Sequence, residues 1–430
     1  MYPQLTEKSF VKQKPDKKAH VYSSFNNHIR GAILINESAS SILGLCDGIH
    51  SEGDIITILS NKYKEDKNIV KENVQGFLDP FIRCGALKDN KVEILHNKIL
   101  RGSSEVYYPD ILCWEITDYC PLNCRHCYLP NKNNHIISKD DIESILKIID
   151  VMGVYQVQVT GGEALTHPEL EYIVDKLISR GLITAVSTSG FNYTDDMLQY
   201  LTKLKNVQGS CLRVSLDGNK NTHNYIRRNE GAYDNAMEFI KGACNRGIPC
   251  QVGTTVMSQS KQEIEDLVVL AKQLGVYYIE IGMLCSQGNA QKNEILPTWS
   301  SKEHSDFLYE LSSKYTSRTF TIKLPKETEQ KNCGAGYGLI RIRPNLDVTP
   351  CPMTEFNLGN LHKNSIFEIM SKCGNVFHDF KFPRDEFCSG CEMEDTCKYC
   401  IAQGYNMKDK VEDCHWFKSI KNCLSPFLVN

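Results

Sequence analysis

Cysteines are the residues of this chain whose number and spacing point most directly to chemistry, since there are 19 of them. Three, Cys120, Cys124 and Cys127, form a C-x3-C-x2-C loop directly after an apolar stretch. Such a loop can direct three thiolates at one point, which is one fewer than a four-iron cluster needs. The loop therefore predicts an iron site with one open position. The spacing alone also leaves open a zinc site or a chance grouping.

A second group of cysteines lies near the end of the chain. Its members are Cys333, Cys351, Cys388, Cys391, Cys397, Cys400 and Cys414, of which the four from Cys388 to Cys400 form C-x2-C-x5-C-x2-C. Two C-x2-C pairs would by themselves fit a zinc ribbon, but seven cysteines exceed one tetrahedral site. Cys285 can supply a further ligand, whereas we expect the other eight cysteines to be buried small apolar residues.

Glycine-containing turns carry the other candidate ligand-binding residues. They are TGGE at 160–163, STSG at 187–190 and VSLDG at 214–218. Glycines let the backbone approach a ligand closely, and Glu163 can accept hydrogen bonds from an ammonium group. Arg227 and Arg228 follow, and either can bind a carboxylate as a two-pronged donor.

The elements that must position these residues repeat a β-then-α pattern six times between residue 111 and about residue 316. Strands are predicted over 112–117, 155–160, 182–188, 211–217, 250–256 and 277–283, and helices over 139–150, 168–180, 194–204, 233–246, 261–274 and 301–315. This alternation builds a parallel sheet with helices outside. We therefore predict an α/β fold with a partial (β/α)6 barrel, in which the turns above lie at the carboxyl ends of the strands.

The cysteine loop and the turns resemble the radical S-adenosylmethionine (SAM) superfamily, over residues 111 to about 290. The resemblance implies that the three cysteines hold a 4Fe-4S cluster whose free iron binds SAM, which reduction then cleaves to a 5′-deoxyadenosyl radical. The residues implied to contact SAM are Gly161, Gly162, Glu163, Ser215 and Arg227, with His126 at the usual aromatic position. Two departures from the family pattern are Ser189, where asparagine is common, and Arg228, where glycine is usual.

The second cysteine group resembles the SPASM domain of radical SAM enzymes that modify peptides. The resemblance implies two auxiliary 4Fe-4S clusters. The outer one would be held by Cys388, Cys391, Cys397 and Cys414, and the inner one by Cys333, Cys351 and Cys400. The inner cluster would keep one iron free for a substrate thiolate unless Cys285 completes it. Leu346 stands where the motif usually has glycine, and we expect Asn345 to adopt the left-handed turn conformation instead.

The first 95 residues predict a small winged-helix-like module, followed by a linker over 96–110. Strands are expected at 19–22 and 31–35, helices from Asn36 or Ser38 to Gly48, over 53–63 and over 69–85, and a returning segment near Val92. NESASSILGLCDG resembles the recognition element of ribosomal peptide maturases, in which a leader peptide adds to the edge of the sheet. A DNA-binding winged helix is the alternative, but this helix is neutral to acidic.

Composition sets the remaining expectations. Hydrophobic residues make up 41% and charged residues 23%, as in ordinary globular chains, and the net charge of −3 offers no general attraction for nucleic acid. No stretch has the length of a signal peptide's apolar core or of a membrane span. Clustered cysteines suit a reducing compartment, so we expect a cytoplasmic protein with no nucleic-acid or membrane partner.

The combined interpretation is a peptide maturase made of a recognition module (1–95), a linker (96–110), a radical SAM barrel (111–320) and a SPASM domain (321–430). It resembles the maturases of subtilosin-type peptides, which join cysteine sulfur to the α-carbon of another residue. The resemblance implies SAM, three 4Fe-4S clusters, a precursor peptide whose leader binds the module, and a low-potential flavodoxin or ferredoxin as reductant. Alternatives are a carbon–carbon crosslink, a thioether to a β- or γ-carbon, formylglycine maturation of sulfatases, or a non-enzymatic zinc or iron–sulfur scaffold.

Overall fold

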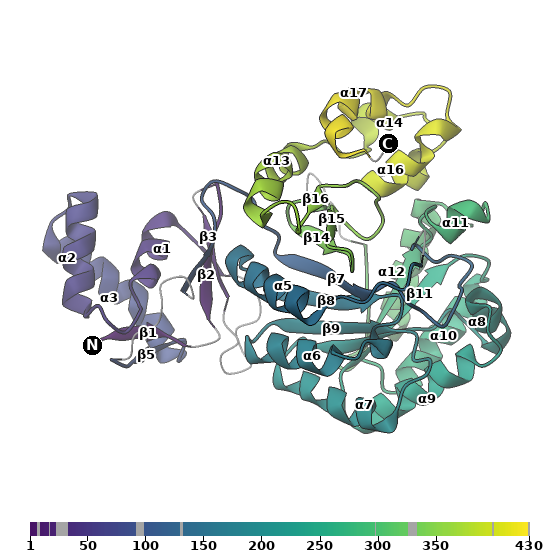
Figure 1. The fold of residues 1–430 in the computed structure, drawn as a ribbon, viewed down its shortest axis with the longest axis horizontal. Helices are drawn as coiled ribbons and strands as arrows, with labels where there is room; N and C mark the ends of the chain where they lie inside the picture. The colour runs from purple at the N-terminus through teal and green to yellow at the C-terminus, as the bar shows by residue number, and fades with distance from the viewer. Residues whose placement is uncertain are drawn as a thin grey trace.

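The computed structural model describes residues 1–6, 9–16, 18–22, 33–91, 99–129, 132–296, 298–325, 333–397 and 400–428. The expected return near Val92 and the first two residues of the strand expected at 31–35 lie outside these ranges. Figure 1 shows the chain running from an N-terminal module, through a central α/β body, to a C-terminal region that lies over one side of that body.

The N-terminal module combines three helices with two small sheets. Its strands are β1 (Pro3–Leu5), β2 (Phe10–Gln13), β3 (Ala19–Tyr22), β4 (Ile33–Ile35), β5 (Leu87–Asp89) and β6 (Leu100–Gly102), and its helices are α1 (Glu37–Gly44), α2 (Glu52–Tyr63) and α3 (Lys67–Arg83). One sheet has the order β4-β3-β2-β6 and the other pairs β1 with β5. The helices begin within two residues of the predicted starts, and the predicted cap Asn36 is confirmed. The side chains of Asn36, Ser51 and Asp66 each accept a hydrogen bond from a backbone N–H of the first turn.

Four short strands of this module were not predicted, and one of them lies in the stretch expected to be a linker. Leu100–Gly102 (β6) pairs in parallel with β2, and Ile99 is buried in the core of the module. Strands of three or four residues carry too little alternation to be recognised, so only the long-range pairing reveals them. Residues 99–102 are therefore part of the N-terminal sheet.

The central body is the predicted partial barrel. Its elements are β7 (Ile111–Thr117), α5 (Lys139–Met152), β8 (Gln156–Gly161), α6 (Leu170–Ser179), β9 (Ile183–Thr188), α7 (Asp195–Tyr200), β10 (Cys211–Ser215), α8 (Lys220–Arg227), α9 (Ala232–Asn245), β11 (Cys250–Val256), α10 (Lys261–Gln273), β12 (Tyr278–Met283), α11 (Asn289–Lys292), α12 (Ser301–Tyr315) and β13 (Thr321–Ile322). Neighbouring strands from β7 to β13 are all parallel. All six predicted strands and the helices between them are confirmed, whereas α8, α11 and β13 were not predicted.

The C-terminal region continues this sheet instead of leaving it. Its elements are β14 (Leu339–Ile342), β15 (Asp347–Thr349), β16 (Gly359–Asn360), α13 (Ile366–Asp379), α14 (Asp385–Cys388), α15 (Glu394–Cys397), α16 (Ile401–Met407) and α17 (His415–Leu424). Strand β14 pairs in parallel with β7, so the sheet has ten strands in the order β13-β12-β11-β10-β9-β8-β7-β14-β15-β16. One hydrophobic core accordingly runs from Val106 to Phe427, separate from the core of the N-terminal module.

The turn between β14 and β15 differs from the expectation. Leu346, not Asn345, adopts the left-handed conformation, with φ of 65°. Its N–H donates to the carbonyl of Arg343 (2.9 Å), and its side chain is buried, with 3% exposure. The Asn345 side chain instead accepts from the backbone N–H of Asp347 (3.3 Å). Burial of a large apolar side chain offsets the cost of the unfavourable backbone conformation.

A buried ion pair joins the N-terminal module to the barrel. The Lys12 side chain is fully buried, with its ammonium 2.8 Å from Asp110 Oδ1 and donating to the carbonyl of Pro109 (2.6 Å). Lys14 and the Tyr22 hydroxyl also donate to Asp110, at 3.0 and 3.2 Å. Asp110 directly precedes β7, so the two cores meet at a polar contact.

Candidate active site and auxiliary cysteines

The cysteine loop lies between β7 and α5, at the carboxyl edge of the barrel sheet. Cys124 is buried, whereas Cys120 and Cys127 are partly exposed. Burial raises the pKa of the Cys120 thiol to about 12 and also raises that of Cys127, and each of these two interacts electrostatically with Cys124. The three loop cysteines therefore lie close enough to one another for their charges to interact.

The turn after β8 packs tightly beneath this loop. A Cβ on Gly161, whose φ is 146°, would lie 2.1 Å from the carbonyl oxygen of Thr117, and one on Gly162 would lie 2.1 Å from that of Tyr119. The N–H groups of Gly162 and Glu163 donate to those same two carbonyls, at 2.7 and 2.8 Å. Both glycines are thus required by the approach of two backbone segments.

Glu163 is buried and held by the end of β9. Thr188 Oγ1 donates to Glu163 Oε1 (2.7 Å), while the N–H and hydroxyl of Ser189 donate to Oε2 (2.8 and 2.5 Å). Burial raises the pKa of this carboxyl, and these hydrogen bonds oppose the rise. Ser189, which departs from the family pattern, therefore positions the carboxylate expected to bind an ammonium group.

The two arginines have different surroundings. Arg227 ends α8 and is buried, and its guanidinium donates to Asp217 Oδ2 (2.7 Å) and to the Cys124 sulfur (3.8 Å). Arg228 is exposed and has a φ of 54°, so it fills the position where glycine is usual by adopting the left-handed conformation. Of the two, Arg227 lies beside the cysteine loop.

Asp217 fixes Arg227 in place. Burial alone would raise the pKa of Asp217, but Arg227, with His126 and His223 nearby, holds it below the ordinary value. The Asp217 N–H donates to Nδ1 of His223 (3.0 Å). A guanidinium carries five N–H groups, so this pairing leaves donors for a ligand carboxylate.

Ser215 and His126 complete the set of residues predicted to surround SAM. Ser215 ends β10 beside Gly253 of β11 and is partly buried. His126 lies between two of the loop cysteines, and burial lowers the pKa of its imidazole to about 4. Its Nδ1 atom is one of the buried polar atoms with no hydrogen-bond partner among the described residues.

A buried polar network was missed by sequence reasoning. Arg341 on β14 is fully buried and lies 3.4 Å from Glu115 Oε1 on β7, while Tyr128, next to Cys127, donates to that same oxygen (2.8 Å). Arg341 also donates to the carbonyls of Pro352 (3.2 Å) and Thr354 (2.9 Å), just after Cys351. The available signal was the presence of charged residues inside otherwise apolar strands, since buried charges are paired.

The outer auxiliary cysteines converge on one small cavity. Cys388, Cys391, Cys397 and Cys414 all line it, together with Trp416 and other residues of the C-terminal helices. The pKa of the Cys397 thiol is raised to about 12, chiefly by burial and then by the nearby thiols of Cys388, Cys391 and Cys414. The structure therefore gathers the four cysteines that the sequence assigns to the outer cluster.

The inner auxiliary cysteines form a second neighbourhood. The pKa of the Cys333 thiol is raised to about 12, chiefly by burial, then by the nearby thiol of Cys400 and less strongly by that of Cys351. The pKa of Cys351 is raised to about 11, again chiefly by burial and then by Cys400. Cys285 interacts with Cys400 and Cys351 as well. Within the described part of the chain, no three Cys, His, Asp or Glu side chains converge as the ligands of a single metal ion would. A four-iron cluster is larger than one ion, and thiolates spaced around it suit its ligation.

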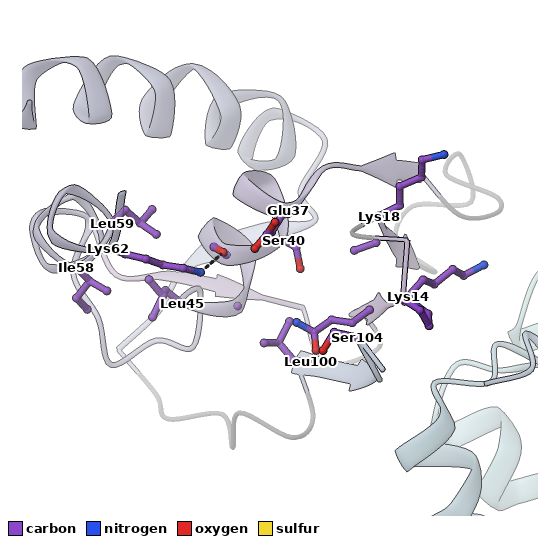
Figure 2. Close-up of a pocket in the computed structure, with 15 residues that line it drawn as sticks. Lys14, Lys18, Glu37, Ser40, Leu45, Ile58, Leu59, Lys62, Leu100 and Ser104 are labelled. Carbon is purple, nitrogen blue, oxygen red and sulfur yellow. Dashed lines mark hydrogen bonds between the residues drawn. The ribbon is translucent and has the colours of Figure 1, made fainter. Parts of the chain in front are cut away.

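The N-terminal module has an open sheet edge and a groove. Strand β4 pairs with β3 and has no second neighbour among the described strands, and its Ile33 and Leu34 are 39% and 57% exposed. Figure 2 shows the groove, of about 550 Å³, with the apolar side chains of Leu45, Ile58, Leu59 and Leu100 and the amino groups of Lys14, Lys18 and Lys62 along it. Lys62 donates to the Ser41 hydroxyl across the groove (2.9 Å).

Three family descriptions match successive parts of the chain. Residues 27–87 match the coenzyme PQQ synthesis protein D (PqqD), residues 114–271 match the radical SAM superfamily, and residues 333–392 match an iron–sulfur cluster-binding (SPASM) domain.

Two similar proteins cover nearly the whole chain, and a third covers almost two thirds of it. The antilisterial bacteriocin subtilosin biosynthesis protein AlbA of Bacillus subtilis (strain 168) is 28% identical over 97% of this chain and 97% of its own. The sporulation killing factor maturation protein SkfB of the same organism is 26% identical over 63% of this chain and 67% of its own. The crystal structure of Streptococcus suis SuiB bound to precursor peptide SuiA has the same fold, with a TM-score of 0.71, 15% identity and coverage of 96% and 98% of the two chains.

The fold, the three-cysteine loop and the residues around it define this chain as a radical SAM enzyme, with SAM and iron–sulfur clusters as its cofactors. Within that class it belongs with the peptide-modifying radical SAM/SPASM enzymes that carry a PqqD-like recognition domain. The donor set fits these cofactors, because it offers three grouped thiols, a buried carboxylate and an arginine with donors to spare. In the described part of the chain, no helix is both long and apolar enough to cross a bilayer.

Proposed function

We propose that this enzyme joins a cysteine sulfur to the α-carbon of another residue in a ribosomally made precursor peptide. The observation that carries the proposal is the contact of Arg227 with Cys124 at the carboxyl edge of a barrel that also holds the buried Glu163, in a chain that carries a PqqD-like module. The relatives AlbA and SkfB, whose names concern the making of subtilosin and of the sporulation killing factor, support a peptide substrate.

The residues of this chain have distinct roles in binding SAM. Cys120, Cys124 and Cys127 would hold the cluster that supplies a 5′-deoxyadenosyl radical when SAM is bound and reduced. Glu163 would accept from the methionine ammonium while Gly161 and Gly162 shape the turn that carries it. Arg227 would bind the carboxylate, and Ser215 would contact SAM from the end of β10. Ser189 and Asp217 are positioning residues, because each acts on Glu163 or Arg227 and not on the ligand itself.

The reaction removes two hydrogens from the peptide for each bridge. Bound SAM would supply the acceptor for one α-hydrogen atom, the cysteine S–H would give up a proton, and the new S–Cα bond would form. One surplus electron remains and must leave the peptide. The outer cysteines (Cys388, Cys391, Cys397 and Cys414) and the inner ones (Cys333, Cys351 and Cys400) would hold the two auxiliary clusters that accept it.

The N-terminal module would bind the leader peptide at the free edge of β4. An extended peptide can add there through backbone hydrogen bonds, while the exposed Ile33 and Leu34 offer apolar contacts.

We assign the N-terminal module to residues 1–95 and extend it through residue 102. The barrel is assigned to residues 111–320 and the SPASM domain to residues 321–430. We further propose a cytoplasmic enzyme that takes electrons from a low-potential flavodoxin or ferredoxin, since grouped thiols persist in a reducing compartment.

The test of the reaction is mass spectrometry of the precursor peptide after co-expression with the enzyme. We expect a loss of two hydrogens per bridge and protection of the linked cysteine from alkylation. The Cys124→Ala variant should leave the peptide unmodified and form no deoxyadenosine from SAM under reductant. Free thiols in a peptide that has lost two hydrogens would instead establish a carbon–carbon crosslink, and deoxyadenosine formation by Cys124→Ala would contradict the assignment of the loop.

The test of leader binding uses one change on the proposed edge and one in the groove. Leu34→Asp places a charge on the face of β4 that the leader would cover, so we expect the affinity for the leader peptide to fall at least tenfold, as measured by calorimetry. Lys62→Ala changes the groove of Figure 2 and should leave the affinity within about twofold. The reverse pattern would move the leader site from the sheet edge into the groove.

A further inference from the structure

The loop that follows β12 connects the two cysteine regions. Its Asn289 donates from the backbone N–H to the carbonyl of Cys127 (2.8 Å) and from the side chain to the carbonyl of Cys124 (2.9 Å). Gly288 packs so closely that a Cβ there would lie 2.4 Å from the Cys127 carbonyl oxygen. One end of this loop is thus fixed to the loop that would hold the SAM cluster.

The other end of the same loop is fixed to α16, the helix that Cys400 caps. Gln403 Nε2 donates to the carbonyl of Leu284 (2.9 Å), and the N–H of Ser286 donates to Gln403 Oε1 (3.3 Å). Gln287 also donates to Glu355 Oε1 (2.9 Å), four residues after Cys351. Cys285 lies between these anchored residues, so its backbone is held on both sides.

The sulfur of Cys285 faces the inner auxiliary cysteines. Asn406 Nδ2 contacts the Cys285 sulfur at 4.0 Å, while one turn earlier on the same helix the N–H of Gln403 donates to the Cys400 sulfur (3.5 Å). Burial raises the pKa of the Cys285 thiol, and the nearby thiols of Cys400 and Cys351 raise it further. Both sulfurs therefore lie along one face of α16, each with an N–H donor of the kind that tunes cluster thiolates.

We propose that Cys285 is the fourth protein ligand of the inner auxiliary cluster, together with Cys333, Cys351 and Cys400. On cluster assembly the Cys285 thiol releases its proton to solvent and its sulfur bonds to the remaining iron, with no change in oxidation state. This inference rests on the proposed inner cluster and replaces the expectation of three ligands and an open iron. A peptide thiolate can then bind the inner cluster only by displacing Cys285, and the cluster is otherwise an acceptor of electrons.

The consequence that can be measured is whether the inner cluster binds an added ligand. The full-length enzyme is reconstituted anaerobically with excess SAM, which occupies the open iron of the SAM cluster, and then reduced and exposed to 13C-cyanide. In the wild-type protein we expect no 13C hyperfine coupling in the electron–nuclear double resonance spectrum. Cys285→Ala should open the site and gain such a coupling while keeping about four irons in the inner cluster.

Two further variants make the result unambiguous. Cys373→Ala alters a buried cysteine of α13 that contacts Met370 and serves as the matched control, which should behave as the wild type. Cys285→Ser retains an oxygen ligand, so it should shift the resonance of the inner cluster even if the alanine variant folds poorly. Cyanide coupling in the wild type equal to that in Cys285→Ala, or a resonance unchanged by Cys285→Ser, would overturn the proposal.

The inner cluster itself is tested separately by Cys351→Ala, which should lower the iron content by about four per chain. If the iron content stays at the wild-type value, the inner cluster of the proposed function fails. If it falls as expected but the wild-type cluster binds cyanide, only the assignment of Cys285 fails.

Discussion

Glu163, which we propose binds the ammonium group of SAM, is a buried carboxylate with hydrogen bonds at both oxygens. Its two oxygens accept three hydrogen bonds from Thr188 and Ser189, yet burial still raises its pKa. A carboxyl group binds an ammonium best when ionised, so the affinity for SAM should fall as the pH drops through this raised pKa. The hydroxyl of Ser189 therefore helps to hold Glu163 in position and lowers the pKa that burial raises.

Replacing Ser189 by alanine should weaken SAM binding. The variant loses one hydrogen bond to a charged group, worth about 1.5 kcal/mol, so we expect the Kd for SAM to rise about tenfold. The pKa of Glu163 should also rise, because the Ser189 hydrogen bond lowers it in the wild type, and the pH at which binding weakens should move upward. Equilibrium dialysis over a pH series measures both effects.

The controls for this variant are Ser189→Thr and Ser179→Ala. Threonine keeps the hydroxyl and should restore most of the affinity, while Ser179 only donates to the carbonyl of Lys176 on the exposed end of α6. An unchanged pH profile in Ser189→Ala, alongside a lower affinity, would indicate loss of packing and not loss of control over Glu163.

Among the elements, the hairpin of β14 and β15 contains a residue in an unfavourable conformation. Leu346 is buried and has a positive φ, so its side chain stabilises the fold while its backbone opposes it. Truncation to alanine should lose about 3 kcal/mol from the removed side chain, whereas glycine should recover about 1 kcal/mol because it adopts this conformation freely.

We therefore expect the thermal unfolding midpoint to be highest for the wild type, lower for Leu346→Gly and lowest for Leu346→Ala. Leu358 is the matched control, because it is equally well buried but has no positive φ. At that position alanine should be more stable than glycine, as is usual wherever the backbone has a negative φ. The same order at both positions would mean that the conformation of Leu346 costs little.

The elements also differ in how far the sequence determines them. The six barrel strands have five or more residues and clear turn signals, so their positions could be predicted, and the cysteine loop follows from its spacing. The three-residue strands β1, β5 and β6 were not predicted, because they exist only through partners far along the chain. The ion pair of Arg341 with Glu115 joins residues 226 apart, and no local pattern contains such a contact.

At the scale of the whole molecule, the N-terminal module is joined to the barrel by the Lys12–Asp110 pair. Burial lowers the pKa of Lys12 to about 8 although Asp110 raises it, so the lysine is charged at pH 6.5 and largely neutral at pH 9. Below pH 8 both the folded and the unfolded chains hold the proton. Between that value and the ordinary lysine pKa the unfolded chain holds more protons, so this group favours folding as the pH rises.

Asp110→Asn should destabilise the protein in a pH-dependent manner. At pH 6.5 it removes the carboxylate that keeps the buried Lys12 charged, at a cost of about 3 kcal/mol, whereas at pH 9 the lysine is already largely neutral and the cost should be much smaller. Thermal unfolding at both pH values, with the exposed Asp16→Asn as control, measures the difference. A loss of stability that is equal at the two pH values would argue against a charged Lys12.

The parallel pairing of β14 with β7 has a consequence for how the chain is made. Strand β7 is synthesised first in the barrel, but its second neighbour, at Leu339–Ile342, emerges only after the whole barrel has left the ribosome. Until then the apolar β7 has one unpaired edge, and unpaired edges invite association with other chains. Cys351 and the five proposed cysteine ligands from Cys388 to Cys414 follow the same late strand, so cofactor loading and closure of the sheet belong to the same final stage of biogenesis.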